Sequence, residues 1–102
     1  MTLNSELLQS RKTSAQNWFE QLQLRICAAF EKLENEASGP FAPQAREAGR
    51  FVLTPWERKN HDDAPGGGGR MGMLHGRVFE KAGVHCSTVF GTFQPEFAKQ
   101  IP

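Results

Sequence analysis

The sequence has no tyrosine, only two cysteines and no long apolar run. A membrane-spanning helix needs about 20 consecutive apolar residues, so we expect no membrane span. Cys27 and Cys86 lie far apart and lack the spacing of metal ligands, so we expect two buried, reduced thiols. The first residues have no basic segment followed by an apolar one, so we expect no secretory signal and a cytoplasmic location. The formal net charge is only +1, which does not favour nucleic acid or an anionic membrane as a partner.

The 102 residues are enough for one small domain, and their pattern predicts the α+β class. We expect residues 1–13 to be flexible and residues 14–36 to form an amphipathic helix with Ser14 as its N-cap. Glutamates 31, 34 and 36 near its end oppose the helix dipole, so we expect that end to fray. The apolar stripe is predicted to pack into the core, and it comprises Trp18, Phe19, Leu22, Ile26, Ala29, Phe30 and Leu33.

Breaker residues at 38–43 separate this helix from a series of predicted antiparallel strands. The strands are expected at about residues 50–58, 70–75, 77–82 and 84–93, and a helix is expected to start at 95–101. His75-Gly76 is predicted to form a tight hairpin turn, with glycine supplying a positive φ. Residues alternate along the last strand, so His85 and Cys86 point to opposite faces and cannot share a metal. The first helix would cover one face of this sheet and leave the other bare.

Four consecutive glycines, Gly66 to Gly69, lie at the centre of the stretch from Trp56 to Gly91, and ordering them costs conformational entropy. Gly67, Gly69 and Gly72 match the G-x-G-x-x-G fingerprint of dinucleotide-binding proteins, but no helix is expected after them, so we reject nucleotide binding. Two interpretations remain: backbone N–H groups approach a ligand as in an anion nest, or the segment is a mobile connection or a packing point for another strand. The preceding loop contains His61, Asp62 and Asp63, which we expect to be solvated rather than to bind a metal.

Five sequence blocks occur in an order and spacing that resemble the oxygen-dependent coproporphyrinogen-III oxidase family. They are Trp-Glu-Arg at 56–58, the glycines at 66–69, Gly-Arg-Val-Phe-Glu-Lys-Ala-Gly-Val at 76–84, Ser-Thr-Val-Phe-Gly at 87–91 and Pro-Glu-Phe-Ala at 95–98. The resemblance implies a large, flat antiparallel sheet flanked by helices in a homodimeric enzyme. It implies oxidative decarboxylation of two propionates of coproporphyrinogen III, which gives protoporphyrinogen IX. Oxygen is the co-substrate, no flavin or haem is needed, and metal use in the family is disputed.

The resemblance and the glycine segment together predict where a substrate and a partner would bind. The predicted substrate-binding residues are Gly66, Gly67, Gly68, Gly69 and Arg70. The predicted dimer interface comprises Met73, Leu74, Val78, Phe79, Glu80 and Lys81. Arg70 and Arg77 could recognise propionates, since guanidinium groups pair well with carboxylates, or could be solvated residues at strand ends.

We expect no catalytic residue in this chain, because the family's substrate-binding Ser, proton-donating His and Asn-x-Arg clamp would lie beyond Pro102. Residues 14–102 would then be the N-terminal part of a single oxidase domain, inactive by itself. The loop at 60–65 is longer than is usual in the family. Two alternatives remain: a non-catalytic remnant that associates through an exposed sheet edge, and an unrelated module that binds an anion at the glycines.

Overall fold

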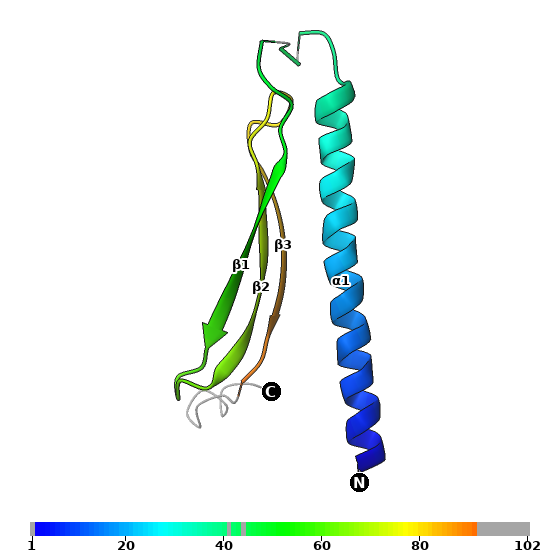
Figure 1. Cartoon of the computed structure of the whole chain (residues 1–102), viewed down its shortest axis with the longest axis vertical. Coiled ribbons are helices and arrows are strands. Elements are labelled where there is room, and N and C mark those ends of the chain that lie inside the picture. Colours follow the sequence, from blue (N-terminus) through cyan, green and yellow to red (C-terminus); the bar gives the residue numbers. More distant parts are fainter. Residues whose placement is uncertain (1, 41, 44, 92–102) are drawn as a thin grey trace, which may run out of the picture.

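Figure 1 shows the computed structural model of the chain, which describes residues 2–40, 42–43 and 45–91. The elements in chain order are α1 (Thr2–Glu36), β1 (Phe51–Lys59), β2 (Pro65–Leu74) and β3 (Ala82–Val89). The three strands form one antiparallel sheet in the order β1-β2-β3, and α1 runs along one face of it. The predicted α+β class, a helix followed by antiparallel strands, is confirmed.

Helix α1 begins at Thr2, twelve positions before the predicted start at Ser14. Residues 2–13 belong to the helix instead of forming a flexible terminus. They contain neither glycine nor proline and are rich in Leu, Glu, Gln, Lys and Arg, all good helix formers. The apolar stripe fades in this segment, which is why the periodicity alone placed the start too late.

The strand predictions at 50–58 and 70–75 are confirmed by β1 and β2, although β2 begins earlier than predicted, and β3 confirms the first part of the last predicted strand. Residues 77–82 do not form a return strand, because residues 75–81 make a loop and β3 begins only at Ala82. The glycines lie in β2 rather than in a loop before it. Residues 92–93 of the last predicted strand and the predicted helix at 95–101 lie outside the described residues.

One face of the sheet packs against α1, and the opposite face is uncovered by any of the residues described. Side chains alternate along each strand, and Arg70 of β2 contacts α1, which fixes the two faces. In β3 the half-buried Cys86 therefore faces α1 while His85 faces away, as predicted. The uncovered face exposes large apolar side chains, namely Val52, Trp56, Met71 and Val89.

Most of the apolar stripe of α1 does not face the sheet, which contradicts the sequence prediction, and Phe30 is the member of the stripe that packs there as predicted. The sheet-facing positions are occupied by Glu20, Gln23, Cys27, Phe30, Glu31 and Glu34. Phe19, Ile26 and Leu33 each precede one of these by one position, so they lie about 100° around the helix. Their exposed fractions are 55%, 37% and 54%. Polar side chains of α1 face the sheet because they form hydrogen bonds with backbone groups there. Most of the apolar stripe therefore lies on a side of the helix that does not face the sheet.

The chain has little core for its length. Its accessible surface is 8074 Å², whereas a compact protein of this mass exposes about 5,800 Å². Its radius of gyration is 19.2 Å, against about 13 Å for a compact domain of this length. Among the described residues, the buried apolar positions are Cys27, Ala42 and Leu74. Burial, together with the neighbouring Glu31 carboxylate, raises the pKa of the Cys27 thiol. Both cysteines are free, as predicted, but Cys86 is only half-buried.

Candidate functional site

The glycines of β2 are required by the close approach of the neighbouring strands. A Cβ atom on Gly67 would overlap the carbonyl oxygen of Thr88, and one on Gly69 would overlap that of Cys86. On the other side, a Cβ on Gly68 would overlap the carbonyl oxygen of Trp56. Gly67 also has a φ of 95°, which side-chain-bearing residues rarely adopt. The space that a Cβ would need at these positions is therefore occupied by backbone atoms of the neighbouring strands.

The position of these glycines at the centre of the sheet also affects their N–H groups. Gly68 and Gly69 pair with β1 on one side and with β3 on the other. Backbone groups of a central strand point at the neighbouring strands, not out of the sheet as in an anion nest. The structure thus agrees with the interpretation of the glycines as a packing point for another strand. Substrate binding by Gly66, Gly67, Gly68 and Gly69 stays a prediction.

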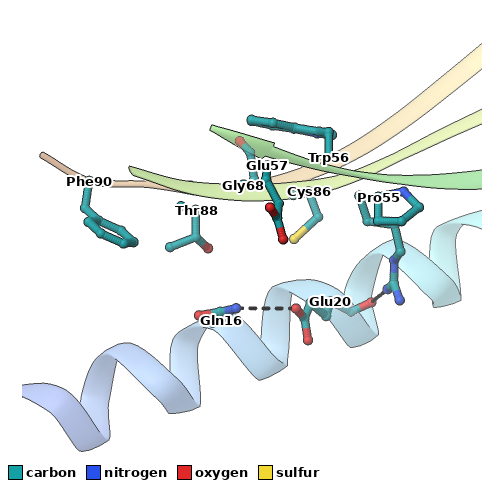
Figure 2. A pocket seen from close by; sticks show the side chains of 13 residues that line it. Gln16, Glu20, Pro55, Trp56, Glu57, Gly68, Cys86, Thr88 and Phe90 are labelled. Atoms are coloured by element: carbon teal, nitrogen blue, oxygen red, sulfur yellow. Dashed lines mark hydrogen bonds between the residues drawn. The ribbon is translucent and has the colours of Figure 1, made fainter. Parts of the chain in front are cut away.

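A cavity of about 380 Å³ lies between the glycine strand and the middle of α1. Figure 2 shows Glu57, Cys86, Thr88 and Phe90 pointing from the sheet towards the helix, with Trp56 on the far side of the sheet. Of the predicted substrate-binding residues, Gly67, Gly68, Gly69 and Arg70 line this cavity, and Gly66 does not. Gly66 is covered by the side chains of Arg58 and Asn60, which lie 2.7 Å from where its Cβ would be.

A hydrogen-bond network on Gln23 holds Arg70 in this cavity. The buried Gln23 amide donates to the carbonyl oxygens of Arg70 (2.7 Å) and Val84 (2.9 Å), so it ties β2 and β3 to the helix. In return, Arg70 donates from Nε to Gln23 Oε1 (2.7 Å) and from a terminal nitrogen to the Glu20 carbonyl oxygen (3.2 Å). Arg70 is therefore engaged within the chain rather than solvated.

The polar lining of the cavity is acidic rather than basic. The carboxylates of Glu20 and Glu57 line it together with Arg70, the only basic residue among the lining side chains. On the surface of α1, Gln16 Nε2 donates a hydrogen bond to Glu20 Oε1 at 3.5 Å (Figure 2). An anionic ligand would meet two carboxylates and one arginine, so the cavity by itself is poorly suited to a molecule bearing several carboxylates.

A buried carboxylate at the other end of the sheet was missed by the sequence analysis. Glu34 is fully buried, and its Oε1 accepts hydrogen bonds from the N–H groups of Gly49 (2.7 Å) and Arg77 (2.8 Å). Its Oε2 accepts from Val78 and Phe79, both at 2.7 Å. Burial acts to raise the pKa of Glu34, but the four N–H groups outweigh it, and the pKa falls to about 2.

This carboxylate explains both the loop at 75–81 and the intact end of α1. Gly76 is needed because a Cβ there would overlap the Glu34 carboxylate. The Arg77 side chain donates to the carbonyl oxygens of Glu34 (2.8 Å) and Asn35 (3.1 Å), which caps the helix C-terminus. The predicted fraying is wrong, because α1 stays helical to Glu36. The sequence signal that could have indicated this is the group of glutamates 31, 34 and 36 in the last helical turns, where the helix dipole disfavours them.

The residues of the predicted dimer interface fall into two groups. Leu74 is fully buried within the chain, and the Phe79 ring packs edge-on against Phe30 with 4.8 Å between ring centres. Glu80 and Lys81 are exposed on the loop, and Met73 and Val78 are half-buried. Only part of this set is thus available to a partner, and its role in a dimer stays a prediction.

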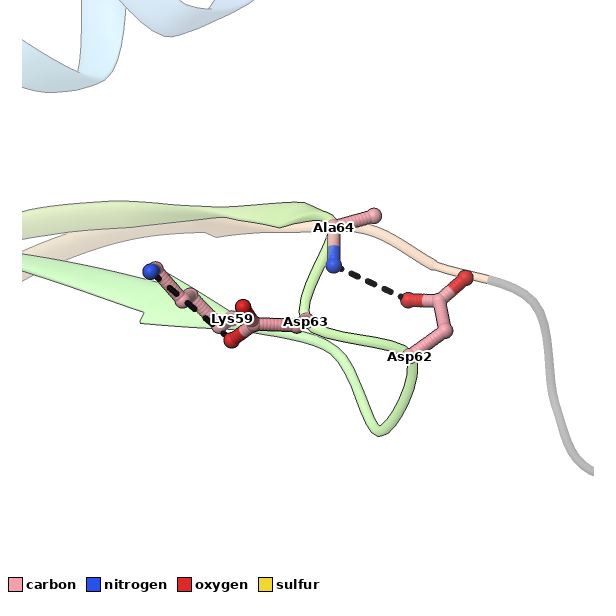
Figure 3. Close-up of polar contacts among 4 residues, drawn as sticks. All are labelled: Lys59, Asp62, Asp63 and Ala64. Carbon is pink, nitrogen blue, oxygen red and sulfur yellow. Dashed lines mark hydrogen bonds and ion pairs between the residues drawn. The ribbon is translucent and has the colours of Figure 1, made fainter.

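The loop between β1 and β2 forms a compact turn (Figure 3). The Asp62 carboxylate accepts a hydrogen bond from the Ala64 N–H at 3.1 Å, and Lys59 lies 3.7 Å from the Asp63 carboxylate. Asp63 has a φ of 67°, a left-handed conformation that Asp tolerates. In the described part of the chain, no group of three His, Cys, Asp or Glu residues is arranged to hold a metal ion. No helix among these residues is long and apolar enough to span a membrane.

Comparisons with known proteins identify the family. The sequence model described as coproporphyrinogen III oxidase matches residues 14–102. The oxygen-dependent coproporphyrinogen-III oxidase of Rickettsia felis is 44% identical over 91 residues, and that of Rickettsia akari is 43% identical. Each alignment covers 89% of this chain but only 30% of the relative, so the chain spans less than a third of the length of these enzymes. No solved structure matches the chain. With this match over most of its length, the chain belongs to the coproporphyrinogen III oxidase family.

Proposed function

We propose that the chain is a part of an oxygen-dependent coproporphyrinogen-III oxidase and supplies the helix and first strands of its sheet. The observation that carries this proposal is the family match over residues 14–102. The uncovered face of the sheet supports it, because Val52, Trp56 and Met71 are exposed there as they would be in a layer of a larger domain. The parent enzyme would convert coproporphyrinogen III and oxygen to protoporphyrinogen IX.

The catalytic residues of this enzyme would lie outside these 102 residues. Among the described residues, Glu34 is the carboxyl whose pKa is shifted far from its ordinary value, and it is fully buried and bound by four backbone N–H groups. It therefore has no access to a substrate. We propose that the glycines and Arg70 shape the sheet beside the substrate site, with the acidic cavity completed by further residues. The parent enzyme would be a cytoplasmic homodimer, to which the exposed Glu80 and Lys81 could contribute contacts.

A chimeric enzyme tests this proposal. Residues 14–102 of this chain would replace the matching segment of the Rickettsia felis relative, and turnover would be followed in air by protoporphyrin fluorescence. We expect activity within about tenfold of the parent, a change of no more than about 1.4 kcal/mol in the barrier. A matched chimera with Gly68→Val should lose activity, because its side chain would overlap the Trp56 carbonyl oxygen.

Two outcomes would contradict the proposal. A chimera that folds with the parent's circular dichroism spectrum but does not turn over would show that this segment cannot serve in the oxidase. Turnover by the isolated 102-residue chain would show that the catalytic residues do not lie elsewhere.

A further inference from the structure

A cluster of backbone N–H groups surrounds the Glu34 carboxylate at the end of the sheet distant from the four glycines. Three of these groups come from consecutive residues of the loop between β2 and β3, Arg77, Val78 and Phe79, and the fourth comes from Gly49. Each carboxylate oxygen accepts two of them, at 2.7 to 2.8 Å. Successive N–H groups that converge on one point form a concave anion site, called a nest. We call these four N–H groups the loop nest.

The loop nest holds the carboxylate through main-chain dipoles rather than through a charged side chain. Burial acts to raise the pKa of Glu34, and the groups that lower it to about 2 are the same four N–H groups. The Arg77 guanidinium donates to main-chain carbonyl oxygens at the end of α1, including those of Glu34 and Asn35. The four donors are thus arranged to stabilise a negative charge that has been removed from water.

The shape of the loop nest fits a carboxylate. A Cβ on Gly76 would overlap the Glu34 carboxylate, and one on Gly49 would lie 2.7 Å from the Gly76 Cα atom. Gly76 does not have a left-handed φ, so the space taken by the carboxylate is what requires glycine there. Because Glu34 is fully buried, a planar group with two oxygens fits the site, whereas a tetrahedral phosphate or sulfate would bring additional oxygens into an enclosed space.

The carboxylate joins parts of the chain that are far apart in the sequence. Gly49 precedes β1, whereas residues 76–79 lie between β2 and β3, and both segments lie beside the C-terminal end of α1 (Figure 1). The Gly76 N–H donates to the Phe79 carbonyl oxygen at 2.8 Å, which closes the loop around the carboxylate. Without an anion at their centre the four donors would be left unsatisfied, so the loop conformation depends on the ligand of the nest.

We infer that the loop nest is a carboxylate-binding site, that Glu34 is its built-in ligand, and that a free small carboxylate binds there when the Glu34 side chain is removed. A ligand attached at position 34 has a high effective concentration at the nest, so a free carboxylate does not displace it in the wild type. The loop nest is separate from the cavity beside Arg70, and its binding of a carboxylate does not depend on the proposed oxidase function.

Urea unfolding of Glu34→Ala tests this at neutral pH, because replacing Glu34 by alanine removes the atoms of an acetate ion. Sodium acetate is compared with sodium chloride of the same ionic strength. We expect Glu34→Ala to be less stable than the wild type and acetate to restore stability in a saturable manner. At ten times the dissociation constant, the ratio of folded to unfolded chain should rise about elevenfold. Acetamide has the same shape without the charge, so it should not restore stability, and the wild type should respond to neither compound.

Two further variants separate binding at the nest from a general effect of salt. Replacing Glu34 by glycine removes the atoms of a propionate ion, so Glu34→Gly should respond more strongly to propionate than to acetate, and Glu34→Ala should do the reverse. Gly76→Ala combined with Glu34→Ala should not respond to acetate, because the added Cβ occupies the place of the carboxylate. In NMR spectra, the Gly49 and Phe79 amide signals should shift in Glu34→Ala and return with acetate.

Several outcomes would overturn the inference. Acetate and acetamide could act equally, the wild type or the double variant could respond to acetate as strongly as Glu34→Ala, or Glu34→Ala could be as stable as the wild type. A Glu34→Ala chain that is unfolded and does not refold at any acetate concentration would also overturn it. A chain that is unfolded alone and refolds with acetate but not with acetamide would support it.

Discussion

Replacing Glu34 by glutamine should destabilise the chain more than any exposed substitution. The carboxylate accepts four backbone N–H bonds, two on each oxygen, at 2.7 to 2.8 Å. An amide keeps one acceptor oxygen, and its NH₂ group would face two N–H donors. Two hydrogen bonds to a charged acceptor, each worth about 1.5–3 kcal/mol, would therefore be lost. We expect a fall of about 3–5 kcal/mol in the free energy of unfolding, the range for a broken buried charge interaction.

The pKa of Glu34 gives a second estimate and a pH dependence. A fall of the pKa from 4.5 to about 2 corresponds to about 3 kcal/mol of stability at neutral pH. Because the folded pKa is depressed, this contribution is present above pH 4.5 and is lost as the pH falls towards 2. The difference in stability between the wild type and Glu34→Gln should therefore shrink across that window.

Urea unfolding followed by the fluorescence of Trp18 and Trp56 measures both effects, at pH 7, 5, 3.5 and 2.5. Hydrogen exchange should show faster exchange of the Gly49 and Phe79 amides in Glu34→Gln. Glu36→Gln is the control, since Glu36 is exposed, and it should change stability by less than about 0.5 kcal/mol. A Glu34→Gln variant within about 1 kcal/mol of the wild type at pH 7, or a difference that stays constant down to pH 2.5, would refute the reasoning.

Three further substitutions probe the other contacts. Gly68→Val should lower stability by about 1–3 kcal/mol despite the strand propensity of valine, because its side chain would overlap the Trp56 carbonyl oxygen; a thermal melt unchanged from wild type would contradict this. Gln23→Leu should cost about 2–3 kcal/mol in urea unfolding, since it leaves the Arg70 guanidinium and carbonyl groups without their partner. Arg77→Met should cost about 1 kcal/mol and speed hydrogen exchange in the last turn of α1; equal exchange would argue against its capping role.

Local patterns in the sequence predicted where the helix and strands form better than they predicted which residues those elements pack against. The alternation in β1 and β3 placed these strands and correctly put His85 and Cys86 on opposite faces. The periodicity found α1 but not its full length, because helix propensity continues to Thr2 where the apolar stripe ends. The glycines were expected in a loop, since glycine is disfavoured in strands unless neighbouring backbone leaves no room for a Cβ.

For the candidate site, too, the sequence indicated individual residues but not the contacts that position them. The sequence singled out the glycines and Arg70, and the structure brings four of those five residues to one cavity. It could not predict that Gln23 would hold Arg70, because these residues are 47 positions apart. It also assigned the wrong role to most of the apolar stripe, since a stripe predicts burial without saying which surface provides it.

The sequence alone determined the α+β class and the membership of the family, because these reside in residue types and short spacings. Only the tertiary structure decided which side of α1 meets the sheet, why β2 needs glycine and how Glu34 shapes the loop at 75–81. The physical reason is that these features depend on backbone groups brought together from distant positions, such as Glu34 and the Arg77 N–H, 43 residues apart. Backbone donors and acceptors are the same at every non-proline position, so their pairing leaves no pattern in the sequence.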